Sequence, residues 1–477
     1  MRRTLYAPIL SLLQCGLACG TLCALGGTSA AAKAAPVTRA TLSVLPFERF
    51  TLPNGLEVLV HEDHTTPIVA IDINYHVGSK DEAPGKTGYA HLFEHLMFKG
   101  ARNVADGQHF HAILEAGGTC NATTNRDRTH YFETVPSSYL SRVLFLEADR
   151  MAHLLDGLTQ HSLDNQRDVV RNERRQNYEN RPYGVAVRAL AEALYPVGHP
   201  YHWLTIGDHA DLERASLADI QAFFRHYYRP GNATLAIAGD VDLASAKKLV
   251  TEHFGGIPSD PAHPEQTSST RTERPAPLPI VTLLADKNLD LDDTVSLERV
   301  TLAWPSPAAM QPGDADLDLV SYLLGPSSGR LHRKLVHELQ IAQSVSVGQA
   351  SGLLASHFEV TVLVKPGHTS SEVQKVVDDE LDAVRSGKAP ITKDELASAL
   401  TQVQAGTFYD LMSLVDRCGR LLQYDYVAKD PGFLERDLER YRAVTPDSVR
   451  AALGVLGTFR VRMIVHPKKP ARAEVSR

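Results

Sequence analysis

Hydrophobic and polar residues alternate along several short segments in the first third of the chain, which predicts β-strands. Residues 47–63 form a predicted hairpin that turns at Asn54-Gly55, a dipeptide that favours tight two-residue turns. Residues 67–77 are rich in β-branched side chains, which favour extended structure. Further strand-like segments occupy residues 119–125 and 129–135.

Apolar residues spaced three to four apart predict the helices between and after these strands. Ser216 is a good N-cap for one of them, and Asp219 follows at the third helical position, close to a capping box. That helix leads into a strand at residues 234–239. The predicted helices lie within residues 88–100, 110–116, 137–155, 162–180 and 216–228, and a further one, capped by Asp240 or Asp242, runs to about Phe254.

The second half of the chain repeats this organisation. Thr445-Pro446-Asp447 opens a helix that leads into the last strand, as Ser216 does in the first half. The repetition predicts an α/β fold, an α+β sandwich of two homologous domains related by internal duplication, each a mainly antiparallel sheet packed against helices. Strands are predicted near 280–284 and 295–304 and over 344–350, 357–364 and 459–467, with helices over 313–324, 330–339, 370–385, 393–424 and 431–442.

Residues 257–279 separate the two predicted domains. This segment is dense in Pro, Ser and Thr and has no apolar period, as expected of a linker. The N-terminal domain then covers residues 36–256 and the C-terminal domain residues 280–477. A mature chain of about 440 residues is too long for one hydrophobic core, so its length also favours two domains.

Residues 1–35 are expected to be an export signal rather than part of the fold. Arg2 and Arg3 precede an apolar stretch, and Ala- and Ser-rich sequence follows it. An uncleaved membrane anchor is the alternative. No other stretch is long and apolar enough to span a bilayer. The protein is therefore expected to be periplasmic or secreted, without stable membrane insertion after signal cleavage.

Charge and cysteine content exclude two further classes of protein. The net charge is −7 and there is no long basic run, so nucleic-acid binding is not expected. Cys120 and Cys418 remain after signal removal. Two cysteines form neither a disulfide scaffold nor a cysteine-based zinc site. A single disulfide bond between these two residues is the remaining alternative.

The segment GYAHLFEHLMFKG, residues 88–100, contains a His-x-x-Glu-His motif. On a helix, His91 and His95 lie one turn apart on the same face, as two ligands of one tetrahedral zinc require. Glu94 leans over that face and is placed to accept a proton from the attacking water rather than to bind the metal. This order of residues is the inverzincin signature. Two surface histidines on an amphipathic helix are the alternative interpretation.

A catalytic zinc usually has three protein ligands, so a carboxylate or a third His is expected elsewhere in the chain. Glu173 is the preferred candidate, because it lies in a predicted helix whose Val169 and Val170 can pack on the core. Glu179 and Glu147 are also candidates by composition, and spacing alone does not decide between the three.

Five segments in order resemble the pitrilysin/insulinase family of zinc peptidases. They are GYAHLFEHLMFKG, GGTCNATTNRDRTHYFETV, RDVVRNERRQNYENRPYG, RHYYRPGNATLAIAGDVD and GRLHRKLVHELQIAQSVSVG, and they are spread over nearly the whole mature chain. The resemblance implies a zinc-dependent peptidase of the exported bacterial type. It also implies paired α/β domains, two such pairs closing around an unfolded peptide.

The resemblance assigns roles to particular residues. His91, His95 and Glu173 would bind one Zn²⁺ per chain, and Glu94 would be the general base. Asn121 and Ala122 resemble the family's substrate-binding edge, whose backbone would pair with the peptide as an added strand. A turn residue is the alternative for Asn121.

The chain departs from the family pattern at three positions. Gln166 stands where many members have a Glu that supports the ligands, and it adds no charge. Val336 and Gln343 stand where active members often have an Arg and a Tyr that hold the substrate. A homologous non-catalytic partner that supplies Arg and Tyr would complete the site in a heterodimer, and a homodimer is the alternative.

These observations predict a zinc metalloendopeptidase that hydrolyses peptides or unfolded segments with a water that zinc and Glu94 activate. A non-catalytic scaffold or peptide-binding subunit of the same fold is the main alternative. A zinc hydrolase with non-peptide substrates is a third.

Overall fold

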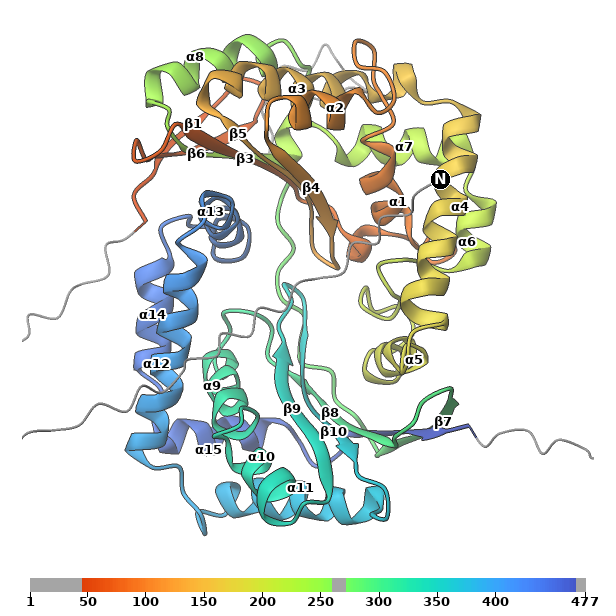
Figure 1. Cartoon of the computed structure of the whole chain (residues 1–477), viewed down its shortest axis with the longest axis vertical. Coiled ribbons are helices and arrows are strands. Elements are labelled where there is room, and N and C mark those ends of the chain that lie inside the picture. The colour runs from red at the N-terminus through yellow and green to blue at the C-terminus, as the bar shows by residue number, and fades with distance from the viewer. Residues whose placement is uncertain (1–44, 260–271, 469–477) are drawn as a thin grey trace, which may run out of the picture. The chain divides into compact units, whose positions relative to one another are not determined.

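The computed structural model describes residues 45–259 and 272–468. The predicted signal at residues 1–35 and the linker residues 260–271 lie outside this description, so the predicted domain boundaries stay a prediction. The described residues form one compact unit that contains two β-sheets and the helices that cover them (Figure 1). In the described residues, no helix has the length and apolar character needed to cross a bilayer.

The first sheet has six strands in the order β1-β2-β6-β3-β5-β4. Strand β2 pairs in parallel with β6, and the other neighbours are antiparallel. The predicted hairpin is confirmed, because Thr51 pairs with Glu57 across the turn that contains Asn54-Gly55. The strands are β1 Glu48–Thr51, β2 Glu57–Glu62, β3 Ile68–Tyr75, β4 Thr119–Thr124, β5 Thr129–Pro136 and β6 Ala233–Gly239.

Helices of the N-terminal half cover one face of this sheet. Alternate residues of β3, such as Ile71, Ile73 and Tyr75, point into a continuous hydrophobic core with helix residues that include Leu144 and Phe224. The predicted cap at Ser216 is confirmed, with reciprocal hydrogen bonds to Asp219. The helices are α1 Tyr89–Leu96, α2 Gln108–Glu115, α3 Leu140–Gly157, α4 Gln160–Arg174, α5 Val185–Leu194, α6 His209–Arg214, α7 Leu217–Tyr227 and α8 Leu243–Phe254.

The second sheet has five strands in the order β7-β11-β8-β10-β9. It too has one parallel pair, β7 with β11, among antiparallel neighbours. Two mainly antiparallel sheets, each packed against helices, therefore confirm the predicted fold class. The strands are β7 Lys287–Asp293, β8 Arg299–Ser306, β9 Ala342–Ala350, β10 Ser356–Val364 and β11 Val461–Pro467.

Helices of the C-terminal half pack around the second core. The predicted single helix over 393–424 is wrong, because the chain turns at residues 411–413 and Ser413 caps a new helix. The predicted strand at 280–284 is also wrong. Leu283 packs in a small hydrophobic cluster there, and the edge strand is β7 instead. The helices are α9 Asp314–Leu324, α10 Arg330–His332, α11 Ser370–Arg385, α12 Lys393–Asp410, α13 Leu414–Ala428, α14 Leu434–Arg442 and α15 Pro446–Val455.

The two halves exchange one helix each. Helix α13, from the C-terminal half, packs on β3 and β6 of the first sheet, where the thiol of Cys418 donates to Ala70 O over 3.7 Å. Helix α5, from the N-terminal half, packs on β7 and β11 of the second sheet. Cys418 is a buried free thiol, and Cys120 on β4 is also a free thiol, so no disulfide joins them.

Candidate metal centre

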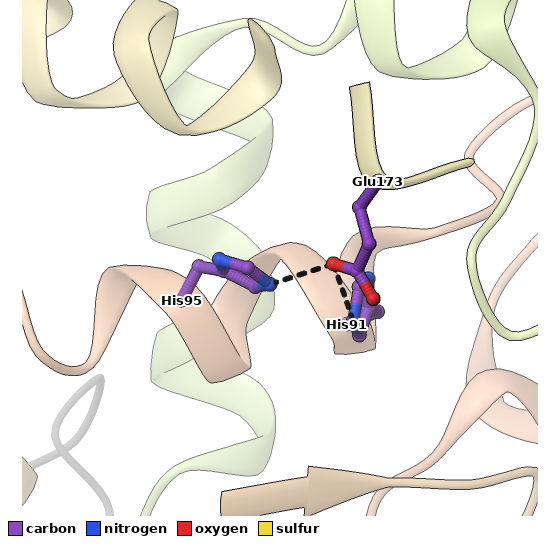
Figure 2. A group of neighbouring side chains, drawn as sticks. All are labelled: His91, His95 and Glu173. Atoms are coloured by element: carbon purple, nitrogen blue, oxygen red, sulfur yellow. Dashed lines mark ion pairs between the residues drawn. The ribbon is translucent and has the colours of Figure 1, made fainter. Parts of the chain in front are cut away.

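Three side chains from two helices meet at one point. His91 and His95 lie one turn apart on α1, and Glu173 reaches them from α4 (Figure 2). Glu173 Oε2 lies 3.6 Å from His91 Nε2 and 3.3 Å from His95 Nε2. One ligand-type atom from each of the three lies within 4.8 Å of the others.

This geometry fits a tetrahedral zinc ion. Zinc bonds to nitrogen and oxygen are about 2.0–2.1 Å long, so two ligand atoms of a tetrahedral site are about 3.3–3.4 Å apart. The distances from the Glu173 oxygen to the two imidazole nitrogens lie close to that edge length. The donor set, two imidazoles and one carboxylate, leaves a fourth position open, as catalytic zinc sites do.

The protonation states of the cluster also suit a metal. Burial lowers the pKa of His91, and the neighbouring His95 lowers it further. The hydrogen bond with His95 lowers the pKa of Glu173, with a further contribution from the charge of His91. Neutral imidazole and ionised carboxylate are the forms that bind zinc.

Glu82 holds the N-terminus of helix α1, a role that the sequence analysis did not predict. Its carboxylate accepts the backbone N–H groups of Gly88 at 2.9 Å and Ala90 at 2.8 Å, and the indole N–H of Trp203 at 3.1 Å. Gly88 has φ of 88°, and a Cβ there would lie 2.8 Å from Ile206 O. A negative side chain at a helix N-terminus is favourable, so Glu82 fixes where His91 and His95 point.

Helix α4 positions Glu173 from the other side. It begins at the capping box of Thr159 with Ser162, and Val170 packs in the core one turn before Glu173. Asn177 Nδ2 donates to Glu173 Oε1 over 3.2 Å, from the π-helical turn Arg175–Glu179 that follows α4. Spacing of four residues on a helix was the sequence signal that could have identified Asn177.

Glu94 lies on α1 beside His95 and is half-buried. Its charge acts on Arg128, whose pKa is lowered mainly by burial. Glu94 lies next to the two histidines but is not one of the three candidate ligands. Its carboxylate is therefore available to exchange a proton with a water.

Asn121 and Ala122 lie on β4, the edge strand of the first sheet, and β4 contacts α1. Asn121 is exposed and Ala122 is buried, facing Tyr131 of β5. Asn121 Oδ1 accepts the backbone N–H of Ala122 at 2.9 Å. The predicted substrate-binding residues therefore stand on a free strand edge next to the metal cluster.

Gln166 is buried on α4, two turns before Glu173. Its Nε2 donates to Asn165 Oδ1 over 3.2 Å, and within the described residues no hydrogen bond joins it to either imidazole. Its predicted support of the ligands stays a prediction.

The other candidate carboxylates lie elsewhere. Glu179 accepts from His209 at 2.7 Å, and Glu147 forms a buried group with His109 and Arg150. Neither carboxylate belongs to the group that contains His91 and His95, whereas Glu173 does. In the second half, Val336 packs against the C-terminal core, and Gln343 is exposed on β9.

Comparison with known proteins gives consistent matches along the chain. The family model described as Insulinase (Peptidase family M16) matches residues 57–200, and the model described as Peptidase M16 inactive domain matches residues 214–403. The zinc protease PqqE of Helicobacter pylori is 31% identical over 394 residues, which cover 80% of this chain and 84% of that protein.

Solved structures share the fold. The crystal structure of a protease from Helicobacter pylori superposes with a TM-score of 0.79 at 27% identity, covering 89% of this chain and 100% of that chain. The periplasmic protease PqqL from Escherichia coli superposes with a TM-score of 0.70 at 16% identity. That match covers 88% of this chain and 48% of PqqL, so this fold corresponds to half of the PqqL chain.

Proposed function

The chain belongs to the insulinase family of peptidases, family M16, and from this membership we propose that it is a zinc-dependent metalloendopeptidase acting on peptides or unfolded segments. The observation that carries the proposal is the convergence of His91, His95 and Glu173, with the Glu173 oxygen close to the edge length of a tetrahedral zinc site from both imidazoles. Names of relatives, which include zinc protease PqqE, agree with it.

The residues divide the chemistry between them. His91, His95 and Glu173 hold the ion, which when bound lowers the pKa of a water and polarises the peptide carbonyl. Glu94 accepts the proton of the attacking water and returns it to the leaving amine. The hydrogen bond from Asn177 orients the Glu173 carboxylate toward the two imidazoles.

The free edge of β4 supports recognition of an extended peptide. A peptide added as a seventh strand beside Asn121 and Ala122 would lie next to α1 and its metal ligands. Pairing with the Ala122 N–H would replace the bond that Asn121 Oδ1 now accepts. Backbone pairing of this kind requires an unfolded segment and is tolerant of its sequence.

We also propose that the protein works as one half of a pair. Val336 and Gln343 cannot donate a charge-assisted bond to substrate, so a homologous partner would supply the Arg and Tyr, with a homodimer as the alternative. The likeness to half of the PqqL chain supports pairing of two such folds. Native co-purification is the test, and a fully active homodimer without a partner would contradict the heterodimer.

Export to the periplasm or the medium is the proposed location, on the basis of residues 1–35. Cell fractionation together with the N-terminal sequence of the purified protein would test it. A protein retained in the cytoplasm with Met1 intact would contradict this proposal.

The decisive experiment compares Glu94→Gln with His91→Ala. We expect Glu94→Gln to keep about one zinc per chain while peptide turnover falls by roughly 10²–10⁴-fold, because only the proton acceptor is lost. His91→Ala should lose both zinc and turnover. Zinc is measured by mass spectrometry and turnover with quenched fluorescent peptides, and Glu115→Gln, on the exposed face of α2, serves as the matched control.

A non-catalytic, peptide-binding subunit is the second candidate. The match of residues 214–403 to the inactive-domain model favours it. That role predicts peptide binding without turnover and no effect of Glu94→Gln, so the same experiment separates the two candidates.

A further inference from the structure

Two cavities adjoin each other beside the metal cluster. One, of about 560 Å³, runs from Asn177 to Arg299, and the other, of about 300 Å³, continues from Arg299 to Arg126. Val187 of α5 and Arg299 of β8 line both cavities, so the two adjoin at these side chains. We refer to them together as the arginine groove.

The groove begins at the candidate metal centre. Asn177, which lines its near end, donates to Glu173 over 3.2 Å. Burial raises the pKa of Tyr178, a further lining residue, and the charge of Glu173 raises it further, whereas Arg126 and Arg181 act in the opposite direction. Glu173 and the arginines therefore lie around the same phenol, and a peptide held at the metal centre would have the groove within reach.

Positive charge dominates the lining. Arg126, Arg181 and Arg299 contribute three guanidinium groups, and among the described lining residues Glu359 carries the one carboxylate. Burial raises the pKa of Glu359, which weakens its opposing charge at low pH. His357, also in the lining, has a pKa lowered to about 3 by burial, so it is neutral.

These arginines lack the carboxylate partners that arginines have elsewhere in the fold. Arg330 pairs with Glu395, and Arg440 pairs with Asp314. Within residues 45–259 and 272–468, Arg126, Arg181 and Arg299 form no direct ion pair, although the charges of Glu359 and Asp293 act on Arg299 from a greater distance. The groove therefore holds cations with unused capacity for an anion.

Aromatic rings hold two of the cations in place instead. The Arg126 guanidinium lies 5.4 Å from the Tyr195 ring centroid and 5.1 Å from that of Tyr201. The Arg299 guanidinium lies 4.5 Å from the Tyr183 ring, with one long hydrogen bond of 3.4 Å to Tyr183 O, and its buried Nε has no acceptor in the described residues. Ring contacts orient a guanidinium and leave its N–H groups for a ligand.

We propose that the arginine groove is a subsite for a carboxylate of the peptide substrate, either an acidic side chain or the free C-terminus. The inference rests on the proposed peptidase function and specifies its substrate class. A guanidinium pair binds a planar carboxylate through paired hydrogen bonds, and the partly buried setting strengthens them relative to water.

The test uses quenched fluorescent peptides of one parent sequence with the full-length enzyme. In one set a single Glu or Gln occupies each position in turn on both sides of the cleaved bond. In the other the C-terminus is a carboxylate or an amide. We expect the carboxylate form to be preferred by about tenfold in kcat/KM, at one side-chain position or at the C-terminus, which identifies the source of the anion.

Arg126→Gln, Arg181→Gln and Arg299→Gln should reduce that preference to below about threefold while cleavage of the uncharged parent peptide persists. Arg188→Gln on α5, whose guanidinium pairs with Glu192 and Asp208 outside the groove, is the matched control and should keep the preference. Arg181 is exposed and makes no ring contact in the described residues, so its variant remains informative if the other two unfold.

The outcomes separate the inference from the function it rests on. Turnover with no carboxylate preference, or a preference that the three variants leave unchanged, overturns the subsite and leaves the peptidase intact. If nothing is cleaved, the peptidase proposal fails. In that case, calorimetry of the same peptides binding to the Glu94→Gln variant tests the subsite without turnover. Equal affinity for the carboxylate and neutral forms of the peptide refutes the subsite.

Discussion

Arg150 is a buried cation beneath the helix that carries the metal ligands. Its guanidinium lies 4.3 Å from the ring centroid of Tyr131 and 5.0 Å from that of Phe98. The Tyr131 hydroxyl donates to Phe93 O of α1 over 3.4 Å. Glu147 and Glu133 pair with Arg150, so a buried charge group supports the packing under α1. Burial raises the pKa of both carboxyl groups above the usual range, and the charge of Arg150 opposes that shift.

This group should make stability depend on pH. Burial raises the pKa of Glu147 to about 8, so the folded protein holds a proton that the unfolded chain releases near pH 4.5. The stability that this proton contributes is complete below the pKa of Glu147 in the unfolded chain. It is lost as pH rises toward and through the pKa of Glu147 in the folded protein. From pH 6.5 to 8 the loss is about 2 kcal/mol, at about 1.4 kcal/mol per pH unit.

Urea unfolding of Glu147→Gln across this range is the measurement. Gln cannot ionise, so the variant should lose less stability than the wild type between pH 6.5 and 8. That pH window avoids the titration of His109. Burial lowers the pKa of His109 to about 3, so its contribution to the free energy of unfolding is lost only as pH falls below 6.5. Parallel curves for the variant and the wild type would show that Glu147 ionises normally.

At the residue scale, the local part of the site was predictable and the distant part was not. The spacing of His91, Glu94 and His95 needs only the helical repeat. Glu173 lies 78 residues beyond His95, and the residues alone left Glu147 and Glu179 as alternatives. Glu82 carried no signal, because its partners are backbone N–H groups that any sequence has.

At the scale of the element, helix α1 depends on its N-terminal anchor. Glu82 satisfies two backbone donors that a helix start leaves without partners, and Trp203 holds the carboxylate from the far side. Burial raises the pKa of Glu82, which shows that this placement costs desolvation and relies on these three donors.

We expect Glu82→Ala to destabilise the protein by about 1–3 kcal/mol, because the N–H groups of Gly88 and Ala90 lose their buried acceptor. Zinc affinity should fall as well, since the imidazoles of α1 are then less well oriented. Urea unfolding and competition with a zinc chelator measure the two effects, with Glu115→Ala as the control. Unchanged zinc affinity would limit Glu82 to a role in stability.

Elements were predicted where the residue pattern itself specifies them. The hairpin at Asn54-Gly55 and the cap at Ser216 depend on local turn and cap chemistry, and both are confirmed. The break between α12 and α13 was missed because its apolar residues continue the helical spacing. Strand β7, KNLDLDD, is a mostly polar edge strand, and only pairing with β11 makes it extended.

At the scale of the whole molecule, the exchange of α5 and α13 ties the two halves together. The alternate residues of β3 and β6 that point away from the first core include Ala70, Ala236 and Ala238, all fully buried. Small side chains let α13 approach the sheet closely. The second sheet depends in the same way on α5, which packs on β7 and β11.

A fragment of residues 36–256 should therefore be less stable than the whole chain. Without α13, the alanines of β3 and β6 lose their cover, so we expect a lower urea midpoint and binding of an apolar dye. Adding residues 280–477 should reverse both changes. A fragment that unfolds cooperatively with the midpoint of the whole chain would show that each half is autonomous.

The position of α13 late in the chain delays completion of the first sheet's second face. Strand β6 ends at Gly239 and α13 begins at Leu414, so 174 residues (413 − 239) are synthesised between the last strand of the first sheet and the helix that covers its second face. At about 5–20 residues per second, that interval lasts roughly 10–35 s. Until α13 is available one face of the first sheet has no cover, so a chain that is kept for export must be shielded by a chaperone over this interval.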